Sequence, residues 1–205
     1  MVELPKGHQA IGVKWVYKKK MNPQGEVERH KARLVVKVYR QKAGIDYDEV
    51  FAPVARMETI RLLISQAAQF EWSVYQMDVK SAFLNGVLEE EVYVKKPLEY
   101  IKARKEQQVL RLRKALYIMK QAPRAWNTRI DSYYKENDFR QCPFEHAIYV
   151  KSRKGELLII ALYVDDLIFM GNSQRLLEEF KEVMKEEFEM TDLEKMRYFL
   201  GLEIR

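Results

Sequence analysis

Unbroken apolar runs and regular apolar spacing divide the chain into expected strands and helices. The longest apolar run covers residues 157–164, and a second run over 167–170 follows after two carboxylates, Asp165 and Asp166. The β-branched and aromatic residues in both runs favour strand, and the longer run is still too short to span a bilayer. The pattern therefore predicts a buried β-hairpin with the two aspartates at its tip.

The remaining patterns predict shorter elements. Apolar residues recur at helical spacing over 57–70 and again over 176–184, where Ser173 is a candidate N-cap. Pro123 suits the first turn of another helix, which ends near Asn137. Alternating or short apolar runs predict strands at 13–21, 27–39, 72–79, 92–95, 109–113, 147–151 and 197–204, with turns at 22–25, 44–47 and 85–86 and an exposed charged loop at 99–108. This irregular interleaving predicts an α+β fold with a largely antiparallel sheet.

Composition and charge narrow the class of protein. The 205 residues are 47% hydrophobic and 32% charged, which allows one sizeable core or one domain of two lobes. A single cysteine, Cys142, excludes an internal disulfide and a cysteine-cluster zinc site and fits a reducing compartment; no signal peptide or membrane span is expected. The net charge of +6 is uneven, because residues 1–70 carry 13 basic and 7 acidic side chains while residues 151–205 carry 9 and 12. The basic front half suggests a polyanionic partner.

A third carboxylate, Asp78, ends the expected strand 72–79. Aspartate is a common turn former, so an isolated Asp165-Asp166 pair would favour a plain turn. Neighbouring anions repel, however, and burying them is costly unless a cation lies between them. Three carboxylates on neighbouring strand ends therefore point to a site for a pair of Mg²⁺ ions.

Several segments carry a resemblance to a known family. They read QMDVKSAFLNG at 76–86, LY at 116–117, KQAPRAW at 120–126 and LYVDD at 162–166. Three shorter motifs also occur in the order expected for the family: KARLV at 31–35, GIDY at 44–47 and FLG at 199–201. With these motifs the chain resembles, from about residue 12 to residue 204, the reverse transcriptase of copia-type LTR retrotransposons, the plant elements above all.

The resemblance implies an RNA-directed DNA polymerase with the palm and fingers of a right-hand polymerase and an antiparallel palm sheet packed on helices. Residues 1–70 would be mainly fingers. Residues 71–205 would be mainly palm, with a fingers segment interleaved near 87–125. The thumb and the RNase H domain would be absent from this chain.

The resemblance also implies a catalytic metal site. Asp78, Asp165 and Asp166 would hold two Mg²⁺ ions together with the backbone carbonyl of Val79, and Mn²⁺ could substitute. One ion would lower the pKa of the primer 3′-hydroxyl, and the other would brace the triphosphate and the leaving pyrophosphate.

Further positions match the nucleotide and primer sites of the family. Phe83 would be the bulky gate that clashes with a ribose 2′-hydroxyl, and Gln121 would border the incoming nucleotide. Arg33 and Lys31 would meet its phosphates, with Arg33 ranked first on the expectation that the two side chains face opposite ways along a strand. The expected primer and template contacts are Tyr163, Lys14, Lys18 and Lys20.

The implied partners are a primed RNA or DNA template, dNTPs and, in an intact element, the rest of the Pol polyprotein, in a cytoplasmic particle or the nucleus and without a membrane. The sequence departs from the family where Ile118, Val38 and the segment 97–100 replace usual glycines. If residue 118 has φ > 0, a β-branched isoleucine would strain the turn before Gln121. The lost glycines keep open an alternative, a catalytically impaired remnant that folds and binds nucleic acid weakly. A third reading, an unrelated metal-dependent phosphohydrolase, would explain the aspartates but not Phe83 or Gln121.

Overall fold

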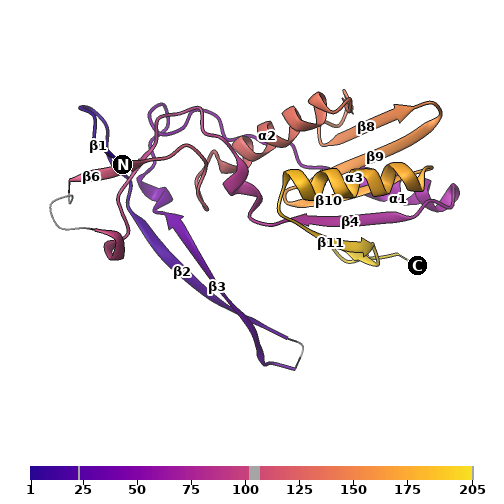
Figure 1. The fold of residues 1–205 in the computed structure, drawn as a ribbon, viewed down its shortest axis with the longest axis horizontal. Coiled ribbons are helices and arrows are strands. Elements are labelled where there is room, and N and C mark those ends of the chain that lie inside the picture. The colour runs from indigo at the N-terminus through magenta and orange to yellow at the C-terminus, as the bar shows by residue number, and fades with distance from the viewer. Residues whose placement is uncertain (23, 102–106, 205) are drawn as a thin grey trace. The chain divides into compact units, whose positions relative to one another are not determined.

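The computed structural model describes residues 1–22, 24–101 and 107–204 (Figure 1). The chain divides into two compact units, residues 1–51 with 83–129 and residues 52–82 with 130–205. Helices and antiparallel strand pairs occur together, which confirms the α+β class. Within the described ranges, no helix is both long enough and apolar enough to cross a membrane.

The second unit is built on a six-stranded antiparallel sheet (Figure 1). In spatial order its strands are β11 (Met190–Lys195), β4 (Val74–Val79), β10 (Asp166–Gly171), β9 (Glu156–Tyr163), β8 (Ile148–Arg153) and β7 (Arg140–Gln141). The helices of this unit are α1 (Met57–Gln69), α3 (Gln174–Glu187) and the second half of α2 (Ala122–Glu136). The two apolar runs of the sequence are β9 and β10, at the centre of the sheet.

Alternate residues of β10 face different helices. Ile168 and Met170 belong to an apolar cluster that includes Ile60 of α1. Phe169 instead meets Phe180 of α3 edge-on, with ring centroids 5.0 Å apart. Helices thus cover both faces of the central strands, which explains why these strands read as continuous apolar runs and not as alternating ones.

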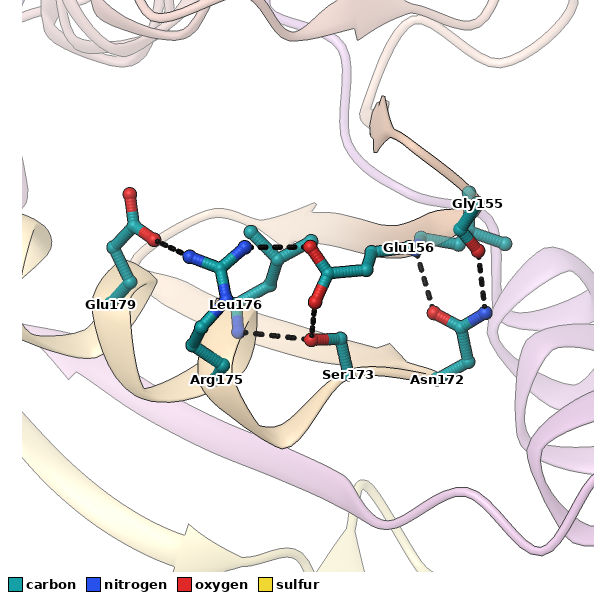
Figure 2. A network of polar contacts seen from close by, with 8 residues as sticks. Gly155, Glu156, Asn172, Ser173, Arg175, Leu176 and Glu179 are labelled. Atoms are coloured by element: carbon teal, nitrogen blue, oxygen red, sulfur yellow. Dashed lines mark hydrogen bonds and ion pairs between the residues drawn. The ribbon is translucent and has the colours of Figure 1, made fainter.

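A polar network ties the start of α3 to the start of β9 (Figure 2). The carboxylate of Glu156 accepts hydrogen bonds from the Ser173 hydroxyl at 2.5 Å and from the Arg175 guanidinium at 2.6 Å. Ser173 is also the N-cap of α3, as expected, because its Oγ accepts from the backbone N–H of Leu176. The network therefore fixes both the hairpin and the helix that covers it.

Gly171 lies at the same end of the hairpin, opposite the turn. A Cβ added to Gly171 would lie 2.0 Å from the carbonyl oxygen of Leu157, so no larger residue fits this strand end. The side chain of Asn172 then holds the neighbouring backbone, because its Oδ1 accepts from the N–H of Leu157 at 2.7 Å. Close backbone approach is thus the reason for glycine here.

The first unit has its own core. Strands β2 (Val13–Met21) and β3 (Val27–Val36) form a two-stranded ribbon, and β1 (Val2–Glu3), β6 (Gln108–Arg111) and β5 (Tyr93–Val94) form a small sheet in that order. Its apolar cluster includes Val36, Val94, Met119 and Ala122. The first half of α2 belongs to the same unit, as does the 3₁₀ helix Ala82–Asn85 from Phe83 onward.

The C-terminal region differs from the expectation. The expected strand 197–204 is instead a short hairpin of β12 (Tyr198–Phe199) and β13 (Leu202–Glu203), because Gly201 has a φ of +85° and reverses the chain. Strand β11 was not predicted, since its polar sequence lacks an apolar period and its order comes from pairing with β4.

Boundaries nearer the N-terminus also change. Helix α1 belongs to the second compact unit, where its buried face packs on the six-stranded sheet. The strand expected to reach residue 39 ends at Val36, and a 3₁₀ helix over Val38–Arg40 follows. Pro23 of the expected turn, and residues 102–106 of the expected charged loop, lie outside the described residues.

Candidate functional site

The three aspartates lie at one end of two neighbouring strands of the second unit. Asp78 of β4 and Asp166 of β10 are direct cross-strand partners in the antiparallel register. Asp165 lies in the hairpin turn, and its backbone carbonyl accepts a hydrogen bond from the N–H of Val79 at 2.8 Å. The antiparallel pairing of β4 with β10 therefore brings together residues that are almost 90 positions apart in the sequence.

The tip of the hairpin is shifted by one residue from the expectation. The turn consists of Val164 and Asp165, whereas Asp166 is already the first residue of β10. Val164 has a φ of +60°, and positive φ at the first turn residue but not the second is the signature of a type II′ hairpin. A β-branched residue is strained in this conformation, so the strong pairing of β9 with β10 must hold the turn in place.

The surroundings of Asp166 disfavour its charged form. Burial raises its pKa, and the charges of Asp165 and Asp78 raise it further. A hydrogen bond from Gln76 Nε2 to Asp166 Oδ1, 2.9 Å long, acts in the opposite direction. A nearby cation would offset both the desolvation and the repulsion.

The donor chemistry of this strand end suits a hard divalent cation, because carboxylate and carbonyl oxygens are the ligands that Mg²⁺ prefers. In the part of the chain that the structure describes, however, no three acidic, histidine or cysteine side chains converge as a ready-made metal group. The three aspartates lie at the same end of neighbouring strands, and the pKa of Asp166 is raised. Among the described residues, however, their carboxylates do not converge closely enough to coordinate one ion.

The ribbon of the first unit has two chemically different faces. Cross-strand partners share a face, and one face carries the pairs Lys18–Lys31, Lys20–Arg29, Val16–Arg33 and Lys14–Val35. We call these residues the cationic face. Like charges directly opposite each other destabilise a strand pair, and a bound anion would relieve this repulsion.

Lys31 and Arg33 lie on this same face, which corrects the expectation that they point in opposite directions. They are two positions apart on one strand, and the side-chain period of a strand is two. The opposite face carries Trp15 and Tyr17, which stack with ring centroids 6.4 Å apart. Tyr17 is 74% exposed, so an aromatic surface is open to solvent there.

Arg33 and Lys31 differ in their surroundings. The Arg33 guanidinium lies over the ring of Tyr117, 5.1 Å from its centroid, and its Nε is buried with no hydrogen-bond partner among the described residues. The pKa of Lys31 is lowered, first by burial and then by the charge of Arg33. An anion close to both side chains would supply a hydrogen-bond acceptor for Arg33 Nε and would favour the charged form of Lys31.

Three further candidate residues have structural partners. Phe83 is half-buried and packs against the apolar cluster of the first unit. Gln121 is 1% exposed, and both its amide oxygen and its amide nitrogen are hydrogen-bonded. Tyr163, the cross-strand partner of Asp166, meets Phe199 edge-on at 5.6 Å.

The structure thus groups the candidates within each unit. The second unit holds the aspartates with Tyr163, and the first unit holds the ribbon cations, Phe83 and Gln121. Sequence reasoning gave no role to Gln76 or Tyr117. Gln76 lies two residues before Asp78, so the strand period places both on one face and could have identified it. The contact of Tyr117 with Arg33 spans 84 positions and left no local signal.

Comparison with known proteins is consistent with these observations. Residues 1–205 match the family model described as reverse transcriptase (RNA-dependent DNA polymerase). The chain is 41% identical over 205 residues to the retrovirus-related Pol polyprotein from transposon TNT 1-94 of Nicotiana tabacum. It is 37% identical over 206 residues to that from transposon RE1 of Arabidopsis thaliana. The whole chain is covered in both cases, but it spans only 15% and 14% of the length of these two relatives.

Proposed function

The chain belongs to the reverse transcriptase (RNA-dependent DNA polymerase) family, and we propose that it is the polymerase domain of a copia-type retrotransposon Pol polyprotein. It would add dNTPs to a primer 3′-hydroxyl on an RNA or DNA template. The observation that carries this proposal is the direct pairing of Asp78 with Asp166, with Asp165 in the adjoining turn. In this reading the second unit is the palm, and the first unit supplies the fingers.

Asp78, Asp165 and Asp166 would hold two Mg²⁺ ions, with the carbonyl of Val79 as a further oxygen ligand. Bound metal would supply the charge that makes the primer hydroxyl nucleophilic and stabilises the leaving pyrophosphate. The raised pKa of Asp166 supports a cation here, since positive charge would offset the repulsion from Asp165 and Asp78. Gln76, by donating to Asp166 Oδ1, would keep that carboxylate oriented.

On the nucleotide side, Arg33 and Lys31 would bind the triphosphate of the incoming dNTP. The buried Nε of Arg33, which has no hydrogen-bond partner in the part of the chain that the structure describes, and the lowered pKa of Lys31 support this role, because phosphate oxygens would supply an acceptor and negative charge. Phe83 would exclude the ribose 2′-hydroxyl. Gln121 would serve the same nucleotide site.

Nucleic acid would be held mainly by the ribbon. Lys14, Lys18 and Lys20 lie on the cationic face and would contact backbone phosphates. Stacked Trp15 and exposed Tyr17 on the other face offer planar rings to unpaired bases. Binding through phosphate contacts should weaken steeply as salt rises.

The alternative is an impaired remnant that folds and binds nucleic acid weakly, and one observation favours it. Ile118 stands where the family usually has glycine, and its φ is +71°, which strains the turn before Gln121. A primer-extension assay on an RNA template with Mg²⁺ or Mn²⁺ distinguishes the polymerase from the impaired remnant. The polymerase should extend the primer, and Asp165→Asn should abolish the extension. A folded chain that binds primed template and never extends it would establish the remnant.

A further inference from the structure

Gln121 is the most completely buried polar side chain of the first unit among the described residues, at 1% exposed. Its Nε2 donates to the backbone carbonyl of Asp46 at 2.7 Å, and its Oε1 accepts from Gln41 Nε2 at 3.0 Å. An amide in this state has already used both of its ends inside the protein. One N–H and one oxygen lone pair remain, but a residue only 1% exposed offers almost no surface for an incoming nucleotide to contact.

The partners of Gln121 belong to one loop, residues 41–47, which we call the clamp loop. Lys120 adds two bonds to it, because its N–H donates to Gln41 Oε1 at 3.0 Å and its Nζ donates to the Tyr47 hydroxyl at 2.8 Å. Gln41 and Asp46 are themselves buried, at 7% exposed each. The two bonds of Gln121 are buried and therefore costly to leave unmade, so they fix the loop to residues 120–121 more firmly than the exposed bond from Lys120 to Tyr47.

The turn that contains Gln121, residues 117–121, is fixed to the ribbon at its other end. The carbonyl of Tyr117 accepts from the N–H of Val36 at 3.3 Å, and Tyr117 forms a bridge with Val35. The ring of Tyr117 lies under the guanidinium of Arg33. Arg33 therefore contacts Tyr117, which lies four residues before Gln121, and Gln121 in turn binds the clamp loop that follows the ribbon in sequence. Gln121 thus completes a closed set of contacts that links the ribbon, the clamp loop and residues 117–121.

We propose that Gln121 is a positioning residue that does not touch the nucleotide. It holds the clamp loop against the turn 117–121, and through Tyr117 it sets the position of Arg33. This proposal rests on the proposed function, in which Arg33 receives the nucleotide phosphates. Its structural part concerns the unliganded chain and can be tested without polymerase activity.

The first test uses Gln121→Met and Gln41→Met, which keep the side-chain length and remove the amide. Hydrogen exchange of the clamp-loop N–H groups should become about tenfold faster in either variant, the effect of losing one or two buried hydrogen bonds on a local opening equilibrium. The NMR signal of Arg33 Nε–H, which lies near the ring of Tyr117, should shift in both variants. Gln66→Met, at an exposed position of α1, is the matched control and should change neither readout.

The second test separates positioning from contact. If Gln121 acts through the loop, Gln41→Met should also raise the KM for dNTP, and the double variant should raise it by less than the two single effects combined, because both single variants lose the shared bond between Gln41 and Gln121. A raised KM in Gln121→Met alone would overturn the proposal in favour of direct contact. Unchanged exchange and an unchanged Arg33 signal in both single variants would overturn it regardless of activity. If the chain never extends a primer, the exchange and NMR results still decide the positioning role, while the proposed function fails separately.

Discussion

Replacing Ile118 by glycine should make the protein more stable, which is unusual for a change that removes a large side chain. Ile118 has a φ of +71°, in the left-handed region, and its side chain is 54% exposed. The strain is therefore large and the buried apolar surface to be lost is small. Glycine adopts this conformation without a clash, because it has no Cβ.

The size of the effect follows from opposing terms. An L-residue in the left-handed region costs about 1–2 kcal/mol, and the β-branch of isoleucine places it toward the upper end. Glycine lowers the stability by roughly 0.5–1 kcal/mol, because it makes the unfolded chain more flexible. The net gain should be about 1 kcal/mol, or roughly 2–4 °C in melting temperature for a chain of this size.

Urea unfolding followed by tryptophan fluorescence and by circular dichroism would measure this gain as a higher midpoint at constant slope. Ile45→Gly is the matched control, because Ile45 is also 54% exposed but its φ is not left-handed, so its replacement should lower stability. Ile118→Ala should fall between the wild type and Ile118→Gly. A lower midpoint for Ile118→Gly, or equal losses in Ile118→Gly and Ile45→Gly, would show that the turn is not strained.

Further predictions concern the site and its supports. Asp78→Asn and Asp165→Asn should each abolish primer extension while thermal melting stays the same or rises, since removing one anion lowers the repulsion; residual extension in either would exclude an essential metal ligand. Phe83→Ala should raise rNTP incorporation relative to dNTP in single-nucleotide assays and cost about 1–3 kcal/mol of stability, because the ring also packs on the core; unaltered sugar discrimination would rule out a gate. Hydrogen bonds from Ser173 and Arg175 hold the pKa of Glu156 below its ordinary value of 4.5, so its contribution to stability is present above that pH and is lost as the pH falls through the lowered value. The melting temperature of Glu156→Gln should therefore lie below that of the wild type at neutral pH and approach it in acid, and a constant difference would contradict the linkage.

The central hairpin could be predicted from the sequence because its signals are local. The apolar runs, the two aspartates between them and the N-cap Ser173 each lie within a few residues of the structure they specify. That Asp78 lies on a strand end beside the other two aspartates was also expected, since it ends an apolar strand, but its register with Asp166 comes from the structure alone. The one-residue shift of the turn could not be predicted from the sequence, because it depends on Val164 adopting a strained φ of +60°.

Other features depend on contacts that leave no trace in local sequence. The buried state of Gln121 is set by partners 75 and 80 positions away, and a glutamine before a helix otherwise reads as exposed. Strand β11 has a polar sequence and exists because β4 offers it an unpaired edge. The error over Lys31 and Arg33 was of another kind, since their spacing of two already predicted a shared face.

The three positions where the family usually has glycine make different demands on the backbone. Ile118 has a positive φ, whereas Val38 lies in the 3₁₀ helix Val38–Arg40 and Glu99 in the 3₁₀ helix Leu98–Tyr100, which suit any L-residue. Two of the three replacements therefore cost no backbone strain, and the third costs an amount small beside typical stabilities of about 5–15 kcal/mol. The glycine losses thus argue for one strained turn in a folded polymerase domain and not for general decay. If that turn limits catalysis, Ile118→Gly should speed primer extension as well as raise stability, and a gain in stability alone would assign any impairment to another part of the chain.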